Sequence, residues 1–348
     1  DGEDIDIYFE GELRDFQKPI VKKYVESAKT KGAGLLEIHC GAGKTVMALK
    51  IISELKKKTL VIVHKEFLLQ QWTERINQFL PTAKVGRIQG KIIDIEGKDI
   101  VIGMLQSLSM KKYPTSLFQQ FGLTIIDETH HIAAEVFSNA LFQIVTKYML
   151  GLSATMDRKD RLTYVFKMFI GDVVYKKERE SNDIVIVKGI NYEIDDEEFS
   201  KVEYNFKGQV HYSKMIKKLC EFNRRTEFII KVLDDSLKEN PAQQFIVLAH
   251  NKNVLKYLHD AIKDRKIATV GYYIGGMKQK DLKISETKKV IIATYAMAAE
   301  ALDIKTLTSL LMATPKSDVR QAVGRILRKK QSNATVYDIV DMHSLFQR

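Results

Sequence analysis

Short apolar runs alternate with amphipathic stretches along the whole chain. Four runs in the first half consist of consecutive apolar and β-branched residues, at 59–64, 99–103, 123–127 and 148–155. Such runs are typical of strands buried on both faces of a parallel sheet. Between them, 43–58 and 66–80 repeat apolar residues at intervals of three or four, which predicts amphipathic helices.

The same alternation returns in the second half. Four more buried strands are predicted at 244–250, 290–294, 307–314 and 335–341, with helices at 253–264 and 317–330. Two successive strand–helix blocks predict an α/β protein of two domains, each built on a parallel sheet. The join at 176–204 is charge-rich and alternates like a strand. We place the boundary so that domain 1 covers 1–195 and domain 2 covers 196–348.

Composition fits this picture and excludes several protein classes. The chain has 348 residues, of which 45% are hydrophobic and 28% are charged, as in a globular protein. No apolar run approaches the roughly 20 residues that span a bilayer, and no basic-then-apolar leader is present. Only Cys40 and Cys220 occur, which excludes a disulfide framework. We therefore expect no membrane contact and a reducing intracellular compartment, the cytoplasm or nucleus, or a virion or host cytoplasm if the chain is viral.

Charge adds a hint about partners. The net charge is +11, and residues 176–348 contribute 31 basic and 23 acidic side chains, a balance of +8. A basic excess in one half favours a polyanion partner. Lysines that solvate helix faces would explain the excess equally well.

A glycine-rich segment, GAGKT, stands between a predicted strand and a predicted helix. Gly41 and Gly43 lack a Cβ, so the backbone can curl with its N–H groups around phosphate oxygens. The N-terminus of the following helix adds its dipole. Lys44 can reach the β- and γ-phosphates, and the Thr45 hydroxyl can ligate Mg²⁺. Ile38 replaces the first glycine of the strict pattern, but the context still predicts nucleotide binding rather than a structural turn.

The strand at 123–127 runs into acids and histidines, in the order DETHH. Acids and imidazoles are the ligands of a metal cage, but further ligands at fixed spacing are missing nearby. A phosphate loop needs a second strand whose terminal acid holds Mg²⁺ and whose next acid orients water. Asp127 and Glu128 are therefore interpreted as that pair.

Taken in order, GAGKT, DETH, GLSAT and QAVGRILR resemble the motor of superfamily 2 DExH-box helicases and translocases. Within it the chain is similar to the XPB-like branch, including versions carried by large DNA viruses and phages. The likeness extends from 13–17 to 325–330, nearly the whole chain. It implies two tandem RecA-like domains with parallel sheets, an inter-domain ATP cleft, and ATP and Mg²⁺ as cofactors.

The resemblance also assigns site residues in the first domain. Thr45 and Asp127 would hold Mg²⁺, and Glu128 would activate water. The residues implied to contact ATP are Arg14, Gln17, Gly41, Ala42, Gly43, Lys44 and Thr45. Nucleic acid would be gripped by His64, Lys65, Gln106 and Ser107. Coupling of hydrolysis to movement would involve His130, Ser153 and Thr155. Trp72, flanked by apolar residues at helical spacing, is expected in the core rather than as a base-stacking platform.

In the second domain, the resemblance implies nucleic-acid contacts from His250, Asn251 and Thr294, and a nucleotide contact from Asp303. Gln321, Arg325 and Arg328 fall at helical spacings of four and three, near one face. The two arginines would reach the γ-phosphate as fingers. Gln321 would meet His130, which gives that histidine a role apart from the metal, whereas His131 is expected to be structural.

Two positions depart from the family pattern. Ala301 stands where relatives usually have glycine, at a cost of about 1 kcal/mol if the turn needs a positive φ. The triplet 158–160 reads Arg-Lys-Asp where XPB-like proteins have Arg-Glu-Asp. That exchange puts any strand-splitting role of the triplet in doubt.

The predicted function is an ATP-dependent nucleic-acid motor, a DNA helicase of 3′→5′ polarity whose two domains step along a strand. Contacts with the sugar-phosphate backbone of the nucleic acid would make binding independent of base sequence. The resemblance favours DNA over RNA. A duplex translocase or protein-stripping factor that leaves the strands paired is the first alternative. A nucleic-acid-binding scaffold with a degenerate ATPase is the second. Transcription or repair proteins are possible partners of any of these.

Overall fold

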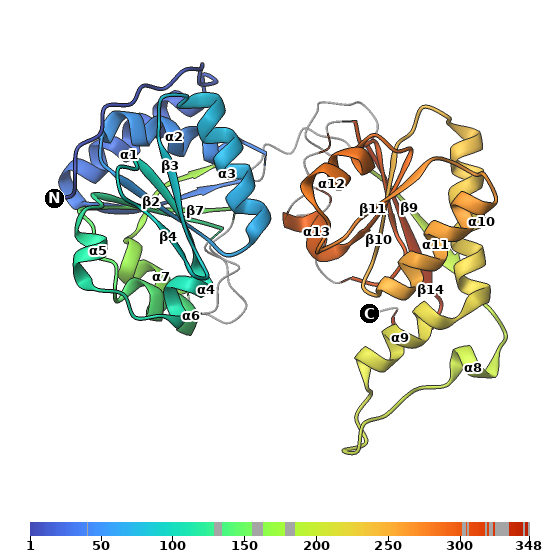
Figure 1. The fold of residues 1–348 in the computed structure, drawn as a ribbon. Coiled ribbons are helices and arrows are strands. Elements are labelled where there is room, and N and C mark those ends of the chain that lie inside the picture. Colours follow the sequence, from blue (N-terminus) through green and yellow to red (C-terminus); the bar gives the residue numbers. More distant parts are fainter. Residues whose placement is uncertain are drawn as a thin grey trace. The chain divides into compact units, whose positions relative to one another are not determined.

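The computed structural model describes the chain except residues 40, 129–133, 155–162, 178–184, 301–303, 305, 317–318, 320–322, 324–333, 344 and 347–348. It forms two compact units, Asp1–Arg179 and Glu180–Arg348 (Figure 1). The division lies ahead of the predicted boundary at 195/196, because the strand β9 (Val185–Tyr192) pairs along its length with the last strand of the second sheet. None of the described helices has the length and hydrophobicity that crossing a bilayer requires.

The first unit is built on a sheet with the strand order β4-β3-β5-β2-β6-β7-β1-β8. Its neighbouring strands are parallel, apart from the antiparallel pair β3–β4. In chain order the strands are β1 (Ala33–Ile38), β2 (Thr59–Val63), β3 (Val85–Gln89), β4 (Ile92–Asp94), β5 (Ile100–Met104), β6 (Leu123–Asp127), β7 (Tyr148–Ser153) and β8 (Val173–Lys177).

Helices cover both faces of this sheet (Figure 1). One face packs against α1 (Gln17–Lys31), α2 (Lys44–Leu55) and α3 (Glu66–Phe79). The other packs against α4 (Leu105–Met110), α5 (Thr115–Gln119), α6 (Ala134–Leu141) and α7 (Thr163–Ile170). Successive residues of a strand point to opposite faces, so adjacent residues such as Leu35 and Leu36 belong to different cores. This double burial is the reason the strands read as unbroken apolar runs.

The second unit has a six-stranded sheet of order β11-β12-β10-β13-β14-β9, in which every neighbouring pair is parallel. Besides β9, its strands are β10 (Phe245–Ala249), β11 (Val270–Tyr273), β12 (Val290–Thr294), β13 (Ser309–Met312) and β14 (Ala334–Asp341). Its helices are α8 (Glu197–Ser200), α9 (Tyr212–Glu221), α10 (Asn223–Glu239), α11 (Lys252–Asp264), α12 (Gln279–Glu286) and α13 (Tyr295–Glu300). One face of the sheet forms a core with α9, α10 and α11.

A buried ion pair fastens α10 to the sheet of the second unit. Arg225 and Asp341 are both fully buried, and Nη2 of the guanidinium donates to Asp341 Oδ2 at 2.7 Å. Nε donates to the second carboxylate oxygen, and Nη1 donates to the carbonyl of Ala313 at 2.7 Å. The planar guanidinium thus joins α10, the end of β14 and the residue that follows β13.

These sheets confirm the predicted class of two α/β domains. Each of the eight apolar runs contains a strand, and the helices predicted at 43–58, 66–80 and 253–264 are present as α2, α3 and α11. The helix predicted at 317–330 lies almost entirely outside the described residues.

Candidate active site

The predicted site residues of the first unit gather at one edge of its sheet. The carboxyl ends of parallel strands share an edge, which is where open α/β sheets bind ligands. Strand β1 leads into the GAGKT segment, and β6 ends at Asp127. Strand β2 is followed by His64, and β7 ends at Ser153. Segments separated by more than a hundred residues therefore lie next to one another.

The GAGKT segment has the backbone that its glycines predict. Gly41 and Gly43 have φ angles of 84° and 83°, in the left-handed region that disfavours other residues. A Cβ on Gly43 would also come within 2.5 Å of Gln17 Nε2. Helix α2 begins at Lys44 without a side-chain cap, so the first turn offers its N–H groups toward the loop. The geometry is that of an anion cradle.

The side chain of Gln17 holds this loop through a hydrogen bond to its backbone. Its side chain is 3% exposed, and Nε2 donates to the carbonyl of Ala42 at 2.7 Å. Its Oε1 accepts from the backbone N–H of Arg14 at 2.9 Å. Both ends of the amide are thus used within the protein. Contact of Gln17 and Arg14 with adenine stays a prediction, and the structure adds that Gln17 braces the loop.

Lys44 and Glu128 form the centre of the site. Lys44 Nζ lies 3.3 Å from Glu128 Oε1, and both side chains are largely buried. Glu128 has a φ of 52°, a left-handed conformation that costs a non-glycine residue about 1–2 kcal/mol. Backbone strain of this kind concentrates at functional sites. The sharp turn at Glu128, directly after β6, thus occurs at the residue whose carboxylate faces Lys44.

Asp127, the preceding residue, is held by a tryptophan that the sequence did not assign to the site. Trp72 Nε1 donates to Asp127 Oδ2 at 2.8 Å, and both side chains are buried. Burial and the neighbouring Glu128 raise the pKa of Asp127 to about 6, opposed by Lys44 and the indole N–H. The core position predicted for Trp72 is confirmed, and its N–H gives it a second role.

The donor set near the loop fits Mg²⁺. Thr45 supplies a hydroxyl in the first turn of α2, and Asp127 supplies a carboxylate with one oxygen already bonded to Trp72. Few hard oxygen ligands, completed by phosphates and water, are how proteins hold this ion. The closeness of the Asp127 and Glu128 carboxylates, which adds to burial in raising the pKa of Asp127, also favours an added cation.

The predicted nucleic-acid segments of the first unit are joined to one another. Gln106 Nε2 donates to the carbonyl of His64 at 2.9 Å, which links the residues after β5 and β2. Ser107 Oγ accepts from the N–H of Gly90 at 2.9 Å. Lys65 directly precedes α3, the helix that carries Trp72. Helix α3 therefore connects Lys65, a predicted nucleic-acid contact, to the Asp127 carboxylate through Trp72.

Ser153 is fully buried at the end of β7, so it can act on a ligand only through its neighbours. The other predicted coupling residues, His130 and Thr155, lie outside the described residues, as does His131. The same holds for the departures at 158–160 and 301 and for four predicted residues of the second unit, Asp303, Gln321, Arg325 and Arg328.

In the second unit, His250 belongs to a polar cluster at the strand ends. Its Nδ1 lies 2.9 Å from Thr314 Oγ1, and its ring centroid is 4.8 Å from that of Tyr295. Burial, and to a smaller extent the charge of Lys316, lower the pKa of this imidazole. Its neutral form can accept or donate a hydrogen bond at neutral pH.

Asn251 and Thr294, the other predicted contacts, serve as helix caps. Asn251 Oδ1 accepts from the N–H of Asn253 at 2.8 Å in the first turn of α11. Thr294 Oγ1 accepts from the N–H of Met297 at 3.4 Å in α13. Their contact with nucleic acid stays a prediction.

Comparisons with known proteins agree with the motifs. Residues 10–158 match the family described as "Type III restriction enzyme, res subunit". A protein of Acanthamoeba polyphaga mimivirus, provisionally named an ATP-dependent RNA helicase, is 35% identical over 97% of this chain. The DNA 3'-5' translocase XPB2 of Sulfurisphaera tokodaii is 26% identical over 94% of this chain and 81% of its own length.

A solved structure has a similar fold. An ATP-dependent Type ISP restriction-modification enzyme bound to DNA matches 96% of this chain and 28% of its own, with a TM-score of 0.60 and 16% identity. The present chain spans 66% of the mimivirus protein, just under two thirds of its length.

Proposed function

We propose that this chain, whose motifs resemble those of superfamily 2 DExH helicases and translocases and which is 35% identical to a mimivirus protein named as a helicase, is a nucleic-acid-stimulated ATPase that moves along nucleic acid. The observation that carries the proposal is the Lys44–Glu128 ion pair beside the Trp72–Asp127 hydrogen bond, behind a loop shaped for phosphates. A structural turn would not need two buried acids and a buried lysine at one sheet edge.

The ion pair suggests how hydrolysis is controlled. Lys44 Nζ lies 3.3 Å from Glu128 Oε1 and offsets the charge of that carboxylate. A triphosphate would draw Lys44 away, because phosphate oxygens carry more negative charge than one carboxylate. Glu128 would then be free to accept a proton from the attacking water. In this scheme the catalytic carboxylate is released only when substrate binds.

Other residues of the first unit position the reactants. Bound Mg²⁺ would supply positive charge that offsets the negative charge of the phosphates. Thr45 and Asp127 would hold it, while the indole of Trp72 orients the Asp127 carboxylate. Gln17 keeps the loop in place through Ala42.

The second unit would complete the reaction. We propose that Arg325 and Arg328 reach the γ-phosphate, and that Gln321 meets His130, when ATP brings the two units together. Hydrolysis would release them, and repeated closure and opening would move the units along a strand. This division of labour follows from the resemblance.

More specifically, we propose that the motor acts on DNA and moves with 3′→5′ polarity. Both features are supported by the name of the archaeal relative, a DNA 3'-5' translocase, whereas the name of the mimivirus relative points to RNA. The duplex translocase that leaves the strands paired remains the second candidate. A degenerate scaffold is disfavoured, because Lys44 pairs with Glu128 and lies close enough to Asp127 to lower its pKa.

The proposal is tested by ATPase rates with single-stranded DNA, duplex DNA and RNA. We expect stimulation by at least one of them, with single-stranded DNA the strongest. Binding should be independent of sequence and weaken steeply with salt, because neutralised phosphates release counterions. Stimulation by duplex DNA without strand separation would select the translocase candidate. An ATPase rate that is unchanged by all three nucleic acids would contradict the proposed motor function.

A second prediction concerns Trp72. We expect Trp72→Phe to retain nucleotide affinity but lower kcat by about tenfold to a hundredfold, because a hydrogen bond to a charged group is worth about 1.5–3 kcal/mol. The matched control is Tyr24→Phe, which removes a buried hydroxyl that donates to the carbonyl of Met149 at 2.7 Å, on α1 of the same unit. That control should lower the melting temperature without changing kcat. Equal kcat values in the two variants would show that Trp72 only fills the core.

A further inference from the structure

A short hairpin, residues 203–211, joins α8 to α9 in the second unit. Tyr204 and Val210 form an antiparallel bridge across it. At the tip, the side chain of Asn205 accepts from the backbone N–H groups of Lys207 and Gln209 at 2.9 and 3.0 Å. Gly208 has a φ of 71°, which suits glycine. The 203–211 hairpin therefore has a defined shape rather than being a loose connection.

The hairpin is also attached firmly at its base. The N–H of His211 donates to the carbonyl of Glu203 at 2.7 Å, and the N–H of Glu203 donates to Met215 Sδ at 3.2 Å on α9. Figure 1 shows the hairpin extending beyond α9, away from the sheet of its unit. It can therefore present side chains to a ligand at small cost in ordering.

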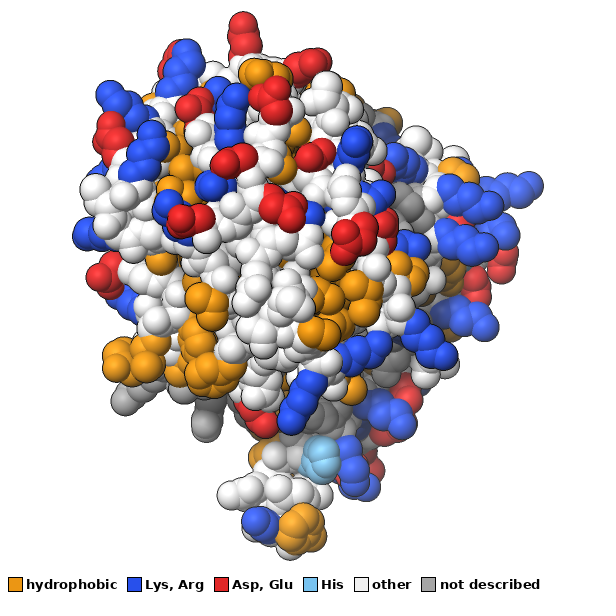
Figure 2. Space-filling view, turned by 60° about the vertical axis from the view of Figure 1, so that its left-hand side comes forward, with side chains coloured by type: hydrophobic (Ala, Val, Ile, Leu, Met, Phe, Trp, Pro, Cys, Tyr) orange, Lys and Arg blue, Asp and Glu red, His pale blue; other side chains and the backbone are white. Residues whose placement is uncertain are grey.

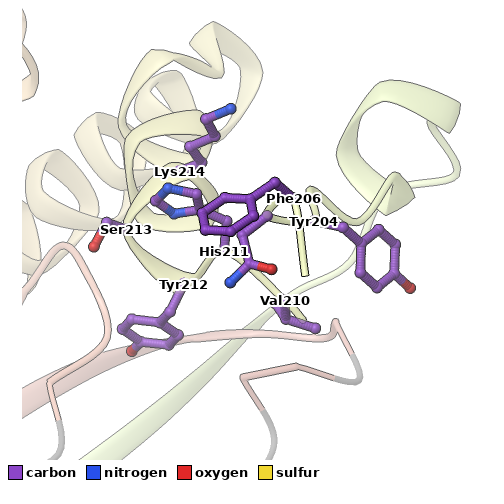
Figure 3. A pocket seen from close by; sticks show the side chains of 8 residues that line it. Tyr204, Phe206, Val210, His211, Tyr212, Ser213 and Lys214 are labelled. Atoms are coloured by element: carbon purple, nitrogen blue, oxygen red, sulfur yellow. The ribbon is translucent and has the colours of Figure 1, made fainter. Parts of the chain in front are cut away.

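Its aromatic side chains are exposed. Phe206 is 95% exposed, Tyr204 58% and Tyr212, the first residue of α9, 51%. Together with His211 and Lys214 they line an open hollow of about 470 Å³ (Figure 3). The ring of Tyr212 lies 5.9 Å from that of Phe346, which packs against the core of the unit, so Tyr212 also serves the fold. The nearly complete exposure of Phe206 suggests a binding role.

The hairpin has Glu203 at its base and Lys207 at its tip, and α9 adds Lys214, Lys217 and Lys218. Lys217 pairs with Glu221 at 3.7 Å, which leaves Lys207 and Lys214 as the lysines nearest to the exposed rings. Lys207 Nζ lies 5.6 Å from the centre of the Phe206 ring. The hairpin is the lowest part of Figure 1. Figure 2 is rotated about the vertical axis, so the hairpin is again at the bottom, where a hydrophobic side chain lies beside a basic one. At the tip, one ring, Phe206, is followed directly by one lysine, Lys207.

We propose that the 203–211 hairpin binds single-stranded nucleic acid, with bases stacked on Phe206 and its neighbouring rings and phosphates near Lys207 and Lys214. Aromatic faces interleaved with cations match a polymer whose bases alternate with phosphates, and stacking accepts every base. The proposal deepens the proposed function by naming a binding element outside the motor's predicted contacts. A protein partner fits less well, because the centres of protein interfaces are depleted in lysine.

The test measures binding of the full chain to two probes, an oligothymidylate and an abasic oligonucleotide of the same length. Phe206→Ala should weaken oligothymidylate binding by about tenfold, since stacking on an aromatic contributes that much per base. Binding to the abasic probe should change by less than about twofold, because it has no bases to stack. Phe206→Trp should restore the wild-type preference for the base-bearing probe.

Two controls sharpen the result. Phe142→Ala removes another exposed ring, on the first unit, and should leave both affinities unchanged. Lys207→Gln should weaken both probes and lower the salt slope by about 0.7, the value for one single-strand phosphate contact. These outcomes separate stacking from charge.

Equal losses with both probes, or no loss with either, would overturn the hairpin proposal and leave a protein partner as the use of the exposed rings. The binding test of the hairpin and the ATPase test of the proposed motor can fail separately. A wild-type ATPase that is stimulated by DNA while Phe206→Ala binds normally would refute only the hairpin. An unstimulated ATPase with base-dependent binding at Phe206 would refute only the motor.

Discussion

Glu128→Gln is expected to lower ATP turnover by about a hundredfold or more while leaving ATP binding intact, since removal of one positioned catalytic group typically costs this much. The amide keeps the shape of the side chain but cannot accept a proton from water. It also removes the ion pair with Lys44, so the lysine should meet phosphate without first leaving a carboxylate. ATP affinity should therefore stay equal or rise. Single-turnover hydrolysis and equilibrium nucleotide binding measure the two effects separately.

Two variants serve as comparisons. Lys44→Ala should abolish hydrolysis through loss of phosphate neutralisation. Glu54→Gln changes a glutamate that pairs with Lys50 at 2.8 Å on the surface of α2, and it should leave turnover unchanged. Near-normal hydrolysis by Glu128→Gln would show that another group activates the water.

Arg225→Met is expected to destabilise the second unit by about 3–5 kcal/mol, because it leaves the Asp341 carboxylate buried without its partner. Two guanidinium–carboxylate hydrogen bonds and the bond to the Ala313 carbonyl are lost together. Denaturant unfolding of the full chain, followed by circular dichroism, measures the change as an earlier transition of one unit.

The exposed pair Arg265–Glu227 is a matched control for Arg225. It is also bidentate, with N–O distances of 2.7 and 2.8 Å, but it lies at the surface. Surface pairs contribute about 0–1 kcal/mol, so Arg265→Met should shift unfolding far less. Replacing both buried partners, as Arg225→Met with Asp341→Leu, should recover much of the stability. A double variant as unstable as Arg225→Met would mean that packing of the guanidinium, rather than the unpaired charge, sets the cost.

Local features of the fold and the site were predictable from sequence. A phosphate loop depends on glycines and a lysine within five positions, so GAGKT and its φ angles follow from adjacent residues. The acids at the end of β6 were predictable for the same reason. Strands buried on both faces gave unmistakable apolar runs, and β12 begins and ends where the sequence predicts.

Contacts between distant residues were not predictable in this way. The Trp72–Asp127 bond joins residues 55 positions apart, and a helical apolar pattern reveals burial without revealing a hydrogen-bond partner. Gln17 reaches Ala42 across a whole helix. The pairing of β9 with β14, about 150 residues further on, was likewise not visible in the sequence. Periodicity identifies a strand but contains no information about which sheet it joins.

Trp72 is the only tryptophan in the chain, and it is hydrogen-bonded to the carboxylate assigned to Mg²⁺. When the excitation wavelength selects tryptophan over the tyrosines, the intrinsic fluorescence of the protein therefore originates at one point, beside the catalytic edge of the first unit. Binding of MgATP should change its emission directly, without an attached dye, and a stopped-flow trace would time the rearrangement around Asp127 separately from product release. Unfolding of the second unit should leave this signal almost unchanged. The chain thus contains its own optical reporter of the nucleotide site.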